Sequence, residues 1–406
     1  MIQIKKNEEQ WAIGSVKNIT FIVTKDCQLA CKYCYLVGKN EKERMPWDIA
    51  KAAIDYILSN ENSEEFAYES VIWDFIGGEP FLEIDLIDKI CDYIKMEMYR
   101  RNHHWFNAYR FSFSTNGINY DSQKVQQFII KNKEHLSIGI TIDGTERKHD
   151  LNRIYKISGK GSYQDVVRNI SLWQKQFPYD GTKVTVSSDD IPYICESVLH
   201  LYSLGIHYVN INCVFENVWK EGDDIILENQ LMQLADAIID NQLYKDYTCS
   251  FFSENLGKPL DCKLENSNWC GSGKMLAIDA AGNFYPCTRF AQYSLRDKEA
   301  WIVGNVRDGI DKNKLRPFLT LDRCTQSSSE CINCEVAEGC AWCQGENFDA
   351  ARTHTVFERA TAICKMHKAR VRANNYYWNK LYRKLELEGT REEFEANKKE
   401  VKPEIC

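Results

Sequence analysis

Three cysteines near the start of the chain are spaced as metal ligands would be. Cys27, Cys31 and Cys34 lie within eight positions in the pattern C-x3-C-x2-C. Three thiolates can hold three corners of a cubane 4Fe-4S cluster and leave one iron open to a further ligand. A zinc ion that takes a fourth ligand from elsewhere is the alternative. The triplet therefore predicts a metal centre, and the rest of the sequence must decide which one.

A second, denser set of cysteines lies in the C-terminal half. Its centre reads C-x2-C-x5-C-x2-C from Cys331 to Cys343, a spacing that suits zinc as well as iron. Single cysteines elsewhere in the chain are more typical of small buried side chains than of ligands. The candidate ligands in this half are Cys262, Cys270, Cys287, Cys331, Cys334, Cys340, Cys343 and Cys364.

Composition limits the classes of protein to consider. The chain has 406 residues, enough for about two or three domains, and 17 cysteines. Its first residues lack the apolar stretch of a signal peptide, so thiolate ligands are favoured over disulfides. The net charge of −7 comes from interspersed acidic and basic residues, without the basic block that binds nucleic acid. No apolar run reaches the roughly 18 residues of a membrane span. We expect a cytoplasmic protein with no nucleic-acid partner and no membrane anchor.

Six short apolar segments, separated by helical patterns, predict an α/β fold. Each segment is rich in β-branched or aromatic residues, and Pro46 suits the start of the first intervening helix. Parallel strands need crossover helices, so this order predicts a partial or complete β/α barrel. The chemistry of such a barrel gathers at the C-terminal ends of its strands, where Cys27 lies. The predicted strands are residues 18–24, 71–77, 109–115, 136–143, 183–188 and 206–216.

The opening triplet, with an aromatic residue directly before its third cysteine, resembles the radical S-adenosylmethionine (SAM) superfamily. The resemblance implies a partial (β/α)6 barrel like that of the TIM fold. It also implies that the open iron chelates SAM, that Tyr33 lies against its adenine, and that the reduced cluster cleaves SAM to a 5′-deoxyadenosyl radical. That radical abstracts hydrogen from an unactivated carbon. The cofactor performs the difficult chemistry and the protein orients it.

Four motifs at later strand ends carry the same resemblance. "GGEP" is similar to the segment whose backbone meets the methionyl amino group, and "STNG" to a ribose-contacting element. "TIDG" leads into "HDLNR", whose arginine is similar to the one that pairs with the methionyl carboxylate, for which a guanidinium fork is well suited. Gly-Gly and Asn-Gly alone are ordinary turn sequences. The implied SAM-binding residues are Tyr33, Gly77, Gly78, Glu79, Pro80, Ser114, Asn116, Asp143 and Arg153.

The C-terminal cysteines resemble the SPASM extension of radical SAM enzymes that modify peptides. Gly282 and Cys287 fit its G-x4-C element, although the last gap of the central motif is two residues instead of three. By this resemblance one auxiliary 4Fe-4S cluster takes Cys270, Cys287 and Cys343. Its fourth ligand is Cys262, with Cys324 or an open site as competitors. The second cluster takes Cys331, Cys334, Cys340 and Cys364, which makes three clusters in all.

These resemblances divide the chain into four parts. An N-terminal segment covers residues 1–17, the barrel residues 18–248 and the SPASM domain residues 249–370. Residues 371–406 are highly charged, and we expect a solvated helical tail there.

Extra clusters suggest an oxidative reaction, because they can accept an electron. Local similarity to maturases of Cys-x-x-x precursors favours a peptide maturase that forms thioethers in a Cys-rich precursor peptide. A small electron donor such as a flavodoxin or a ferredoxin would be its partner. The alternatives are formylglycine formation, as in sulfatase maturases, and carbon–carbon cross-linking. The sulfatase maturase has an aspartate base where this chain has Thr288, and a threonine cannot act as that base. A non-enzymatic electron carrier or zinc protein would leave Tyr33 and Arg153 without a role.

Overall fold

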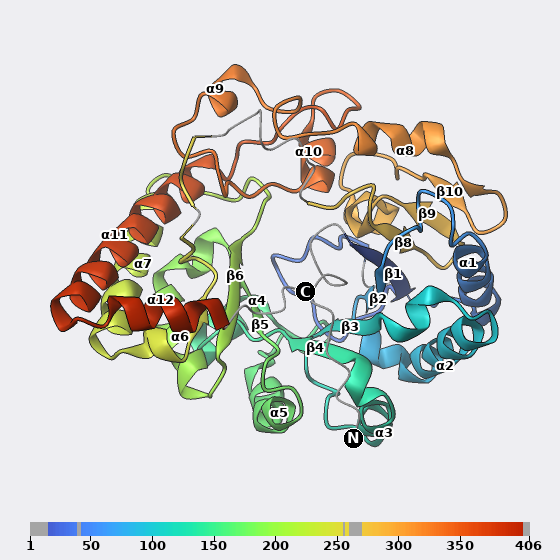
Figure 1. Ribbon diagram of the computed structural model, residues 1–406, viewed down its shortest axis with the longest axis horizontal. Coiled ribbons are helices and arrows are strands. Elements are labelled where there is room, and N and C mark those ends of the chain that lie inside the picture. The colour runs from blue at the N-terminus through green and yellow to red at the C-terminus, as the bar shows by residue number, and fades with distance from the viewer. Residues whose placement is uncertain (1–14, 39–41, 255, 260–269, 401–406) are drawn as a thin grey trace.

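The computed structural model describes residues 15–38, 42–254, 256–259 and 270–400. Its centre is an arc of parallel strands, β1 to β6, with helices on the outside (Figure 1). Strands β1 to β4 are neighbours in one sheet, β5 to β7 form a second sheet, and a single parallel bridge from Thr141 to Lys183 joins the two. The strands of the arc are β1 (Val16–Thr24), β2 (Ser70–Gly77), β3 (Tyr109–Thr115), β4 (Leu136–Ile140), β5 (Thr182–Val186) and β6 (Tyr208–Cys213), followed by β7 (Thr248–Cys249).

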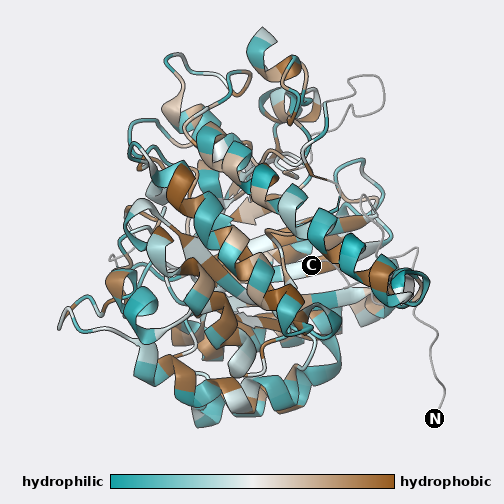
Figure 2. Cartoon of the chain, turned by 90° about the vertical axis from the view of Figure 1, so that its left-hand side faces the viewer, coloured by the Kyte–Doolittle hydropathy of each residue, from teal (hydrophilic) through white to brown (hydrophobic). Residues whose placement is uncertain are grey.

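The helices have the amphipathic pattern expected of a layer around a sheet. In α2, for example, Ile87, Ile90 and Ile94 are fully buried, while charged residues between them face outward. Figure 2 shows hydrophobic and hydrophilic residues alternating along the helices on one side of the molecule. The helices are α1 (Trp47–Ser59), α2 (Ile84–Arg100), α3 (Gln123–Asn132), α4 (Glu146–Asn152), α5 (Tyr163–Gln176), α6 (Ile194–Ser203), α7 (Asp223–Asp240), α8 (Lys312–Leu319), α9 (Ser329–Ile332), α10 (Gln344–Ala350), α11 (Cys364–Glu388) and α12 (Arg391–Glu400).

The α/β architecture predicted from the six apolar segments is confirmed. All six strands form where the sequence placed them, and α1 starts directly after Pro46. The fourth, fifth and sixth strands end earlier than predicted, because β4 ends at Ile140, β5 at Val186 and β6 at Cys213. None of the described helices is both long and apolar enough to cross a membrane.

Four short strands extend the sheet in a way that the sequence did not predict. Strand β8 (Leu276–Ile278) pairs in parallel with β1, and β9 (Asn283–Tyr285), β10 (Gly304–Asn305) and β11 (Gly309–Ile310) follow as antiparallel neighbours. At the start of β1, the buried Lys17 ammonium donates a 2.5 Å hydrogen bond to the carbonyl of Lys274. The cysteine-rich half is thus joined directly to the first strand of the barrel.

The predicted solvated tail is wrong for α11. This helix starts at Cys364 and runs without a break across residue 370. It packs along α7 and buries Tyr377, Leu381 and Leu385. Its charged residues add two ion pairs with α7, from Arg372 to Glu228 and from Lys380 to Asp236. The high charge of the segment concealed the amphipathic pattern of a helix that packs on α7.

Candidate active site

The loop that follows β1 carries the opening cysteines and is hydrogen-bonded to the C-terminal end of α4. The backbone amides of Ala30 and Lys32 donate to the carbonyls of Ile154 and Asn152, at 2.8 and 3.1 Å. Cys27 is buried, while Cys31 and Cys34 are half-buried, and none of the three is in a disulfide. The structure thus presents three reduced thiols on one loop at the C-terminal end of β1.

The GGEP segment at the end of β2 packs directly against this loop. A Cβ atom on Gly77 would collide with the carbonyl of Thr24, and one on Gly78 with the carbonyl of Asp26. The amides of Gly78 and Glu79 donate to these same two carbonyls, at 3.0 and 2.9 Å. Glycine is therefore required at both positions for the strand end and the thiol-bearing loop to approach this closely. Pro80 starts the 3₁₀ turn η2 (Pro80–Glu83) that leads into α2.

Glu79 ties the GGEP and STNG segments together. Its buried carboxylate accepts hydrogen bonds from the Thr115 hydroxyl at 2.6 Å and from the Asn116 amide at 2.8 Å. Burial raises the pKa of Glu79, and these hydrogen bonds oppose the shift. The Asn116 side chain in turn donates to Gln28 at 3.1 Å, next to Cys27, whereas Ser114 is exposed at the end of β3. Both oxygens of Glu79 thus face protein groups of the neighbouring strand end.

Tyr33, Asp143 and Arg153 form one buried group. The Tyr33 hydroxyl donates to Asp143, and Arg153 donates from Nη1 to the Tyr33 oxygen at 3.0 Å. Burial alone would raise the pKa of Asp143, but the positive charges of Lys148 and Arg153 outweigh it and lower that pKa. The Nε atom of Arg153 is buried without a hydrogen-bond partner. Because Tyr33 belongs to the thiol-bearing loop, the guanidinium with this unused donor lies beside that loop.

Hydrogen bonds with His149 and Ser162, which the sequence did not predict, hold Asp143 and Arg153 in place. His149 accepts from the Asp143 amide at 3.2 Å, and its other ring nitrogen contacts Ser162 at 3.0 Å, which donates to the carbonyl of Arg153. Burial lowers the pKa of His149 to about 3, so its ring is neutral. Lys148 and Asp190, both fully buried, lie 3.4 Å apart beside it. The "HDLNR" segment contained this signal, since His149 and Arg153 are one helical turn apart.

Seven of the C-terminal cysteines lie in two groups of neighbouring thiols, and their predicted assignment to two clusters stays a prediction. Cys270, Cys287 and Cys343 interact electrostatically, and burial together with the other two thiolates raises the pKa of Cys287. The second group shares a cavity of about 620 Å³ that also reaches the start of α11, and it consists of Cys331, Cys334, Cys340 and Cys364.

Two further cysteines were candidates for the fourth ligand of the first group. Cys262 lies outside the described residues, so its predicted role stays a prediction. Cys324 is disulfide-bonded in the structure. A cluster ligand must be a thiolate, so Cys324 does not offer one in this state.

A cavity of about 290 Å³ connects the two halves of the protein. One wall is the thiol-bearing loop, including Tyr33, Cys34 and Tyr35, and strand-end residues Ser187 and Glu216 form another. Arg289 and Arg296 close it from the cysteine-rich half. The cavity therefore lies where a substrate could meet residues of both cysteine-bearing regions.

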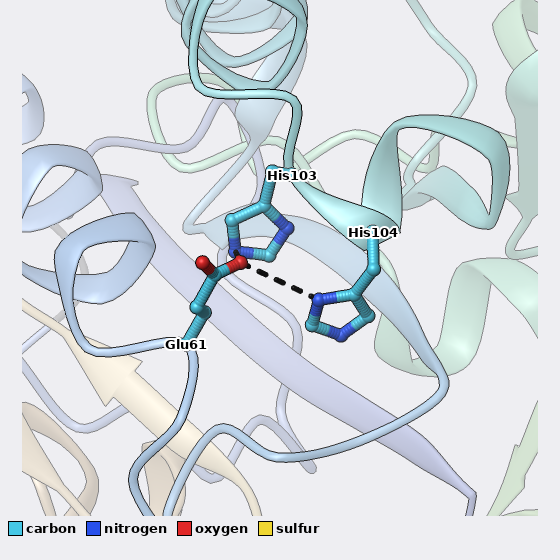
Figure 3. A group of neighbouring side chains, drawn as sticks. All are labelled: Glu61, His103 and His104. Atoms are coloured by element: carbon cyan, nitrogen blue, oxygen red, sulfur yellow. Dashed lines mark ion pairs between the residues drawn. The ribbon is translucent and has the colours of Figure 1, made fainter.

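Glu61, His103 and His104 form a histidine–carboxylate group at the opposite ends of the strands (Figure 3). Glu61 Oε2 lies 3.4 Å from His103 Nε2 and 3.5 Å from His104 Nδ1. The Trp105 amide donates to His103 Nδ1 at 3.1 Å, so the proton of the neutral ring is on Nε2. Burial lowers the pKa of His103 to about 4, which keeps the ring neutral. A metal would need a lone pair on Nε2, so we interpret this group as structural.

Comparison with family models identifies the first half of the chain. The model of the radical SAM superfamily matches residues 21–187. This range contains the opening cysteines and all nine residues, from Tyr33 to Arg153, that the resemblance assigned to SAM.

Curated relatives share low identity over much of the chain. An uncharacterised protein of Methanocaldococcus jannaschii is 28% identical over 75% of this chain and 92% of its own length. A serine-type anaerobic sulfatase-maturating enzyme of Bacteroides thetaiotaomicron is 22% identical over 65% of this chain and 67% of its own length. The radical SAM cyclopropyl synthase TigE of Paramaledivibacter caminithermalis is 21% identical over 80% of this chain and 67% of its own length.

Solved structures show the same fold. The structure of anSMEcpe with bound AdoMet has a TM-score of 0.63 and 17% identity, covering 91% of this chain and 98% of that one. Streptococcus suis SuiB bound to the precursor peptide SuiA has a TM-score of 0.54 and 13% identity, covering 86% of this chain and 76% of that one. Together with the thiol-bearing loop and the strand-end motifs, the family match leads to one conclusion. Residues 21–187 of this chain form a radical SAM domain.

Proposed function

We propose that the protein is a radical SAM peptide maturase that joins a cysteine sulfur to a carbon of another residue in a Cys-rich precursor peptide. The observation that carries this proposal is the cavity of about 290 Å³ lined by both Cys34 and Arg289. Arg289 follows Cys287 by two residues, so a peptide segment in this cavity would lie between the radical SAM loop and the first C-terminal thiol group.

The residues around the thiol-bearing loop fit SAM and a 4Fe-4S cluster. The buried Arg153 Nε has no partner, which suits a carboxylate that would complete its hydrogen bonding. Gly77 and Gly78 bring backbone to within reach of the same site. When bound, the reduced cluster and SAM supply a carbon-centred radical that abstracts hydrogen. Tyr33 and Asp143 orient the Arg153 guanidinium, and the three thiolates would hold the cluster with one iron open.

The C-terminal thiols fit two auxiliary 4Fe-4S clusters of a SPASM domain. Grouped thiols whose negative charges raise one another's pKa are an unfavourable arrangement unless a cation compensates them. Iron of a cluster would supply that charge. In this proposal the auxiliary clusters accept the electron released by an oxidative cross-link, and a flavodoxin or a ferredoxin supplies the electron that starts each turnover.

Peptide substrates of similar proteins support a peptide substrate here. SuiB is described with its precursor peptide SuiA, and anSMEcpe with the Kp18Cys peptide. Both share the fold of this chain at a TM-score above 0.5. A peptide also suits the cavity, whose openness toward solvent is marked by exposed Val37 and Val218 on its rim.

The residues after Cys287 favour cross-linking over formylglycine formation. Thr288 starts the turn η7 (Thr288–Phe290), and a hydroxyl is too weak a base to take a thiol proton. The next residue, Arg289, is cationic and paired with Glu216. Carbon–carbon bond formation is the second candidate, because one relative is named a cyclopropyl synthase.

Mass spectrometry of a reacted precursor peptide tests the thioether proposal. A short Cys-rich peptide encoded beside the gene should lose two hydrogens per bridge, and each donor cysteine should resist alkylation after reduction. Reduction is essential because a disulfide has the same mass change but reopens. If every cysteine is alkylated after reduction while the hydrogens are still lost, the bond is a carbon–carbon link and the thioether proposal is wrong.

A further inference from the structure

Arg289 and Glu216 form a buried ion pair inside the cavity between the two halves. Arg289 Nη1 donates to Glu216 Oε1 at 2.7 Å, and each side chain is only 16% exposed. The guanidinium also lies over the Tyr35 ring, 4.1 Å from its centroid. Glu216 comes from the barrel, just after β6, whereas Arg289 comes from the turn after Cys287. The ion pair, the contact with the Tyr35 ring and the low exposure together restrict both side chains.

Arg289 lies next to two segments that carry C-terminal thiols, since it follows Cys287 by two residues and packs against Gly345. A Cβ atom on Gly345, two residues after Cys343, would lie 2.3 Å from the Cβ atom of Arg289, so the Arg289 side chain starts directly beside this segment. Arg289 also acts on Cys287, through its backbone amide and through its charge, which both oppose the upward shift of that pKa. The cationic residue of the pair thus lies between the segments that carry Cys287 and Cys343, whereas the anionic residue belongs to the barrel.

A fixed positive charge beside a redox centre favours the state with more negative charge. The interaction decays slowly in a buried site, because the low dielectric and the exclusion of water weaken screening. Reduction of an iron–sulfur centre adds one electron, so a nearby guanidinium stabilises the reduced form. A carboxylate at the same place has the opposite effect.

We infer that the Arg289–Glu216 pair sets the reduction potential of the iron–sulfur centre held by Cys270, Cys287 and Cys343. Arg289 raises the potential, so that the centre accepts an electron from the substrate side of the cavity, and Glu216 limits how far it is raised. This inference rests on the proposed function, because it requires a cluster at these thiols. It assigns both residues a role in tuning the centre rather than in binding it.

The test is a redox titration of the anaerobically reconstituted full-length protein, followed by electron paramagnetic resonance. Loss of one signal in Cys287→Ala identifies the centre concerned. At the wild-type midpoint, Arg289→Gln should lower the ratio of reduced to oxidised centre by on the order of tenfold. Glu216→Gln should raise that ratio, and Arg289→Lys, which keeps the charge, should leave it near the wild-type value.

Lys312→Gln is the matched control for a lost positive charge. Lys312 pairs with Glu65 at 3.0 Å but is 70% exposed and does not line the cavity, so its loss should leave the ratio unchanged. Equal ratios in wild type, Arg289→Gln and Glu216→Gln would overturn the inference, as would shifts of the same sign. If Arg289→Gln binds no iron, Arg289→Lys and Glu216→Gln still decide. A wild-type protein with no Cys287-dependent centre would contradict the proposed function itself, which is a different outcome from a centre whose potential ignores the pair.

Discussion

Arg153 is a buried cation of the radical SAM domain with one unused hydrogen-bond donor. A guanidinium buried without a full set of hydrogen bonds is destabilising, and here Tyr33 occupies Nη1 while Nε has no partner. Tyr33 in turn is fixed by Asp143, which the amide of Thr185 also holds at 3.0 Å. The buried arginine is therefore oriented by protein groups and still has a donor available.

Replacement of Arg153 by alanine should weaken SAM binding. A hydrogen bond to a charged group contributes about 1.5 to 3 kcal/mol, so the dissociation constant should rise by roughly 10- to 150-fold. Calorimetric titration of the reconstituted protein measures this, and the iron content should stay unchanged. Arg147→Ala is the control, because Arg147 lies on α4, the helix that ends just before Arg153, but is exposed against Tyr193. Equal binding by Arg153→Ala would make Arg153 a purely structural residue.

The sequence indicated candidate ligands more readily than the charged residues that lie behind them. The cysteines could be singled out as candidate ligands because metal chemistry restricts which side chains serve and at what spacing, and Arg153 because its segment resembles a family motif. Lys148, Asp190 and Glu216 could not, because each is an ordinary charged residue until the fold buries it beside its partner. Glu79 was assigned to the cofactor on the motif alone, whereas its carboxylate is engaged by the next strand end.

His149 should make the stability of the barrel depend on pH. Burial lowers its pKa from 6.5 to about 3, so between these values the unfolded chain binds a proton that the folded protein does not. The His149 contribution to the free energy of unfolding is constant above pH 6.5, and below it this free energy falls by about 1.4 kcal/mol per pH unit on acidification. Urea unfolding should show that His149→Gln destabilises most at pH 7 and by about 2 kcal/mol less at pH 5. His207 is exposed, so the control His207→Gln should change the free energy of unfolding equally at pH 7 and pH 5. If the loss for His149→Gln is also the same at both pH values, His149 is not the source of the pH dependence.

At the scale of elements, the long strands and helices were predictable and the short strands were not. The six strands of the arc are five to nine residues of mostly apolar sequence, long enough for a pattern to be recognised. Strands β8 to β11 have only two or three residues each, so their pairing depends on tertiary contacts. Helix α11 was misjudged because charge dominates its composition, although its apolar residues recur at helical spacing.

The packing of α11 on α7 gives a prediction at this scale. Leu381 is fully buried, so Leu381→Ala should reduce the free energy of unfolding by about 2 to 5 kcal/mol. Leu387 lies on the same helix but is 82% exposed, and Leu387→Ala should change stability by less than about 0.5 kcal/mol. Urea unfolding followed by circular dichroism compares the two. Similar losses for both variants would mean that α11 does not pack as described.

At the scale of the whole molecule, two cysteine-bearing regions share one cavity. Strand β8 fastens the C-terminal half to β1, and the Arg289–Glu216 pair spans the gap between the halves. The thiol-bearing loop and the C-terminal thiols therefore keep a fixed relation, which a reaction that abstracts hydrogen on one side and removes an electron on the other requires.

Cleavage of SAM by the reduced protein tests the central claim most directly. After anaerobic reconstitution and reduction with dithionite, the wild-type protein should bind about twelve irons and release 5′-deoxyadenosine, measured by liquid chromatography. The variant with Cys27, Cys31 and Cys34 changed to alanine should keep about eight irons and release none. Release of 5′-deoxyadenosine by that variant, or none by the iron-loaded wild type, would contradict the account.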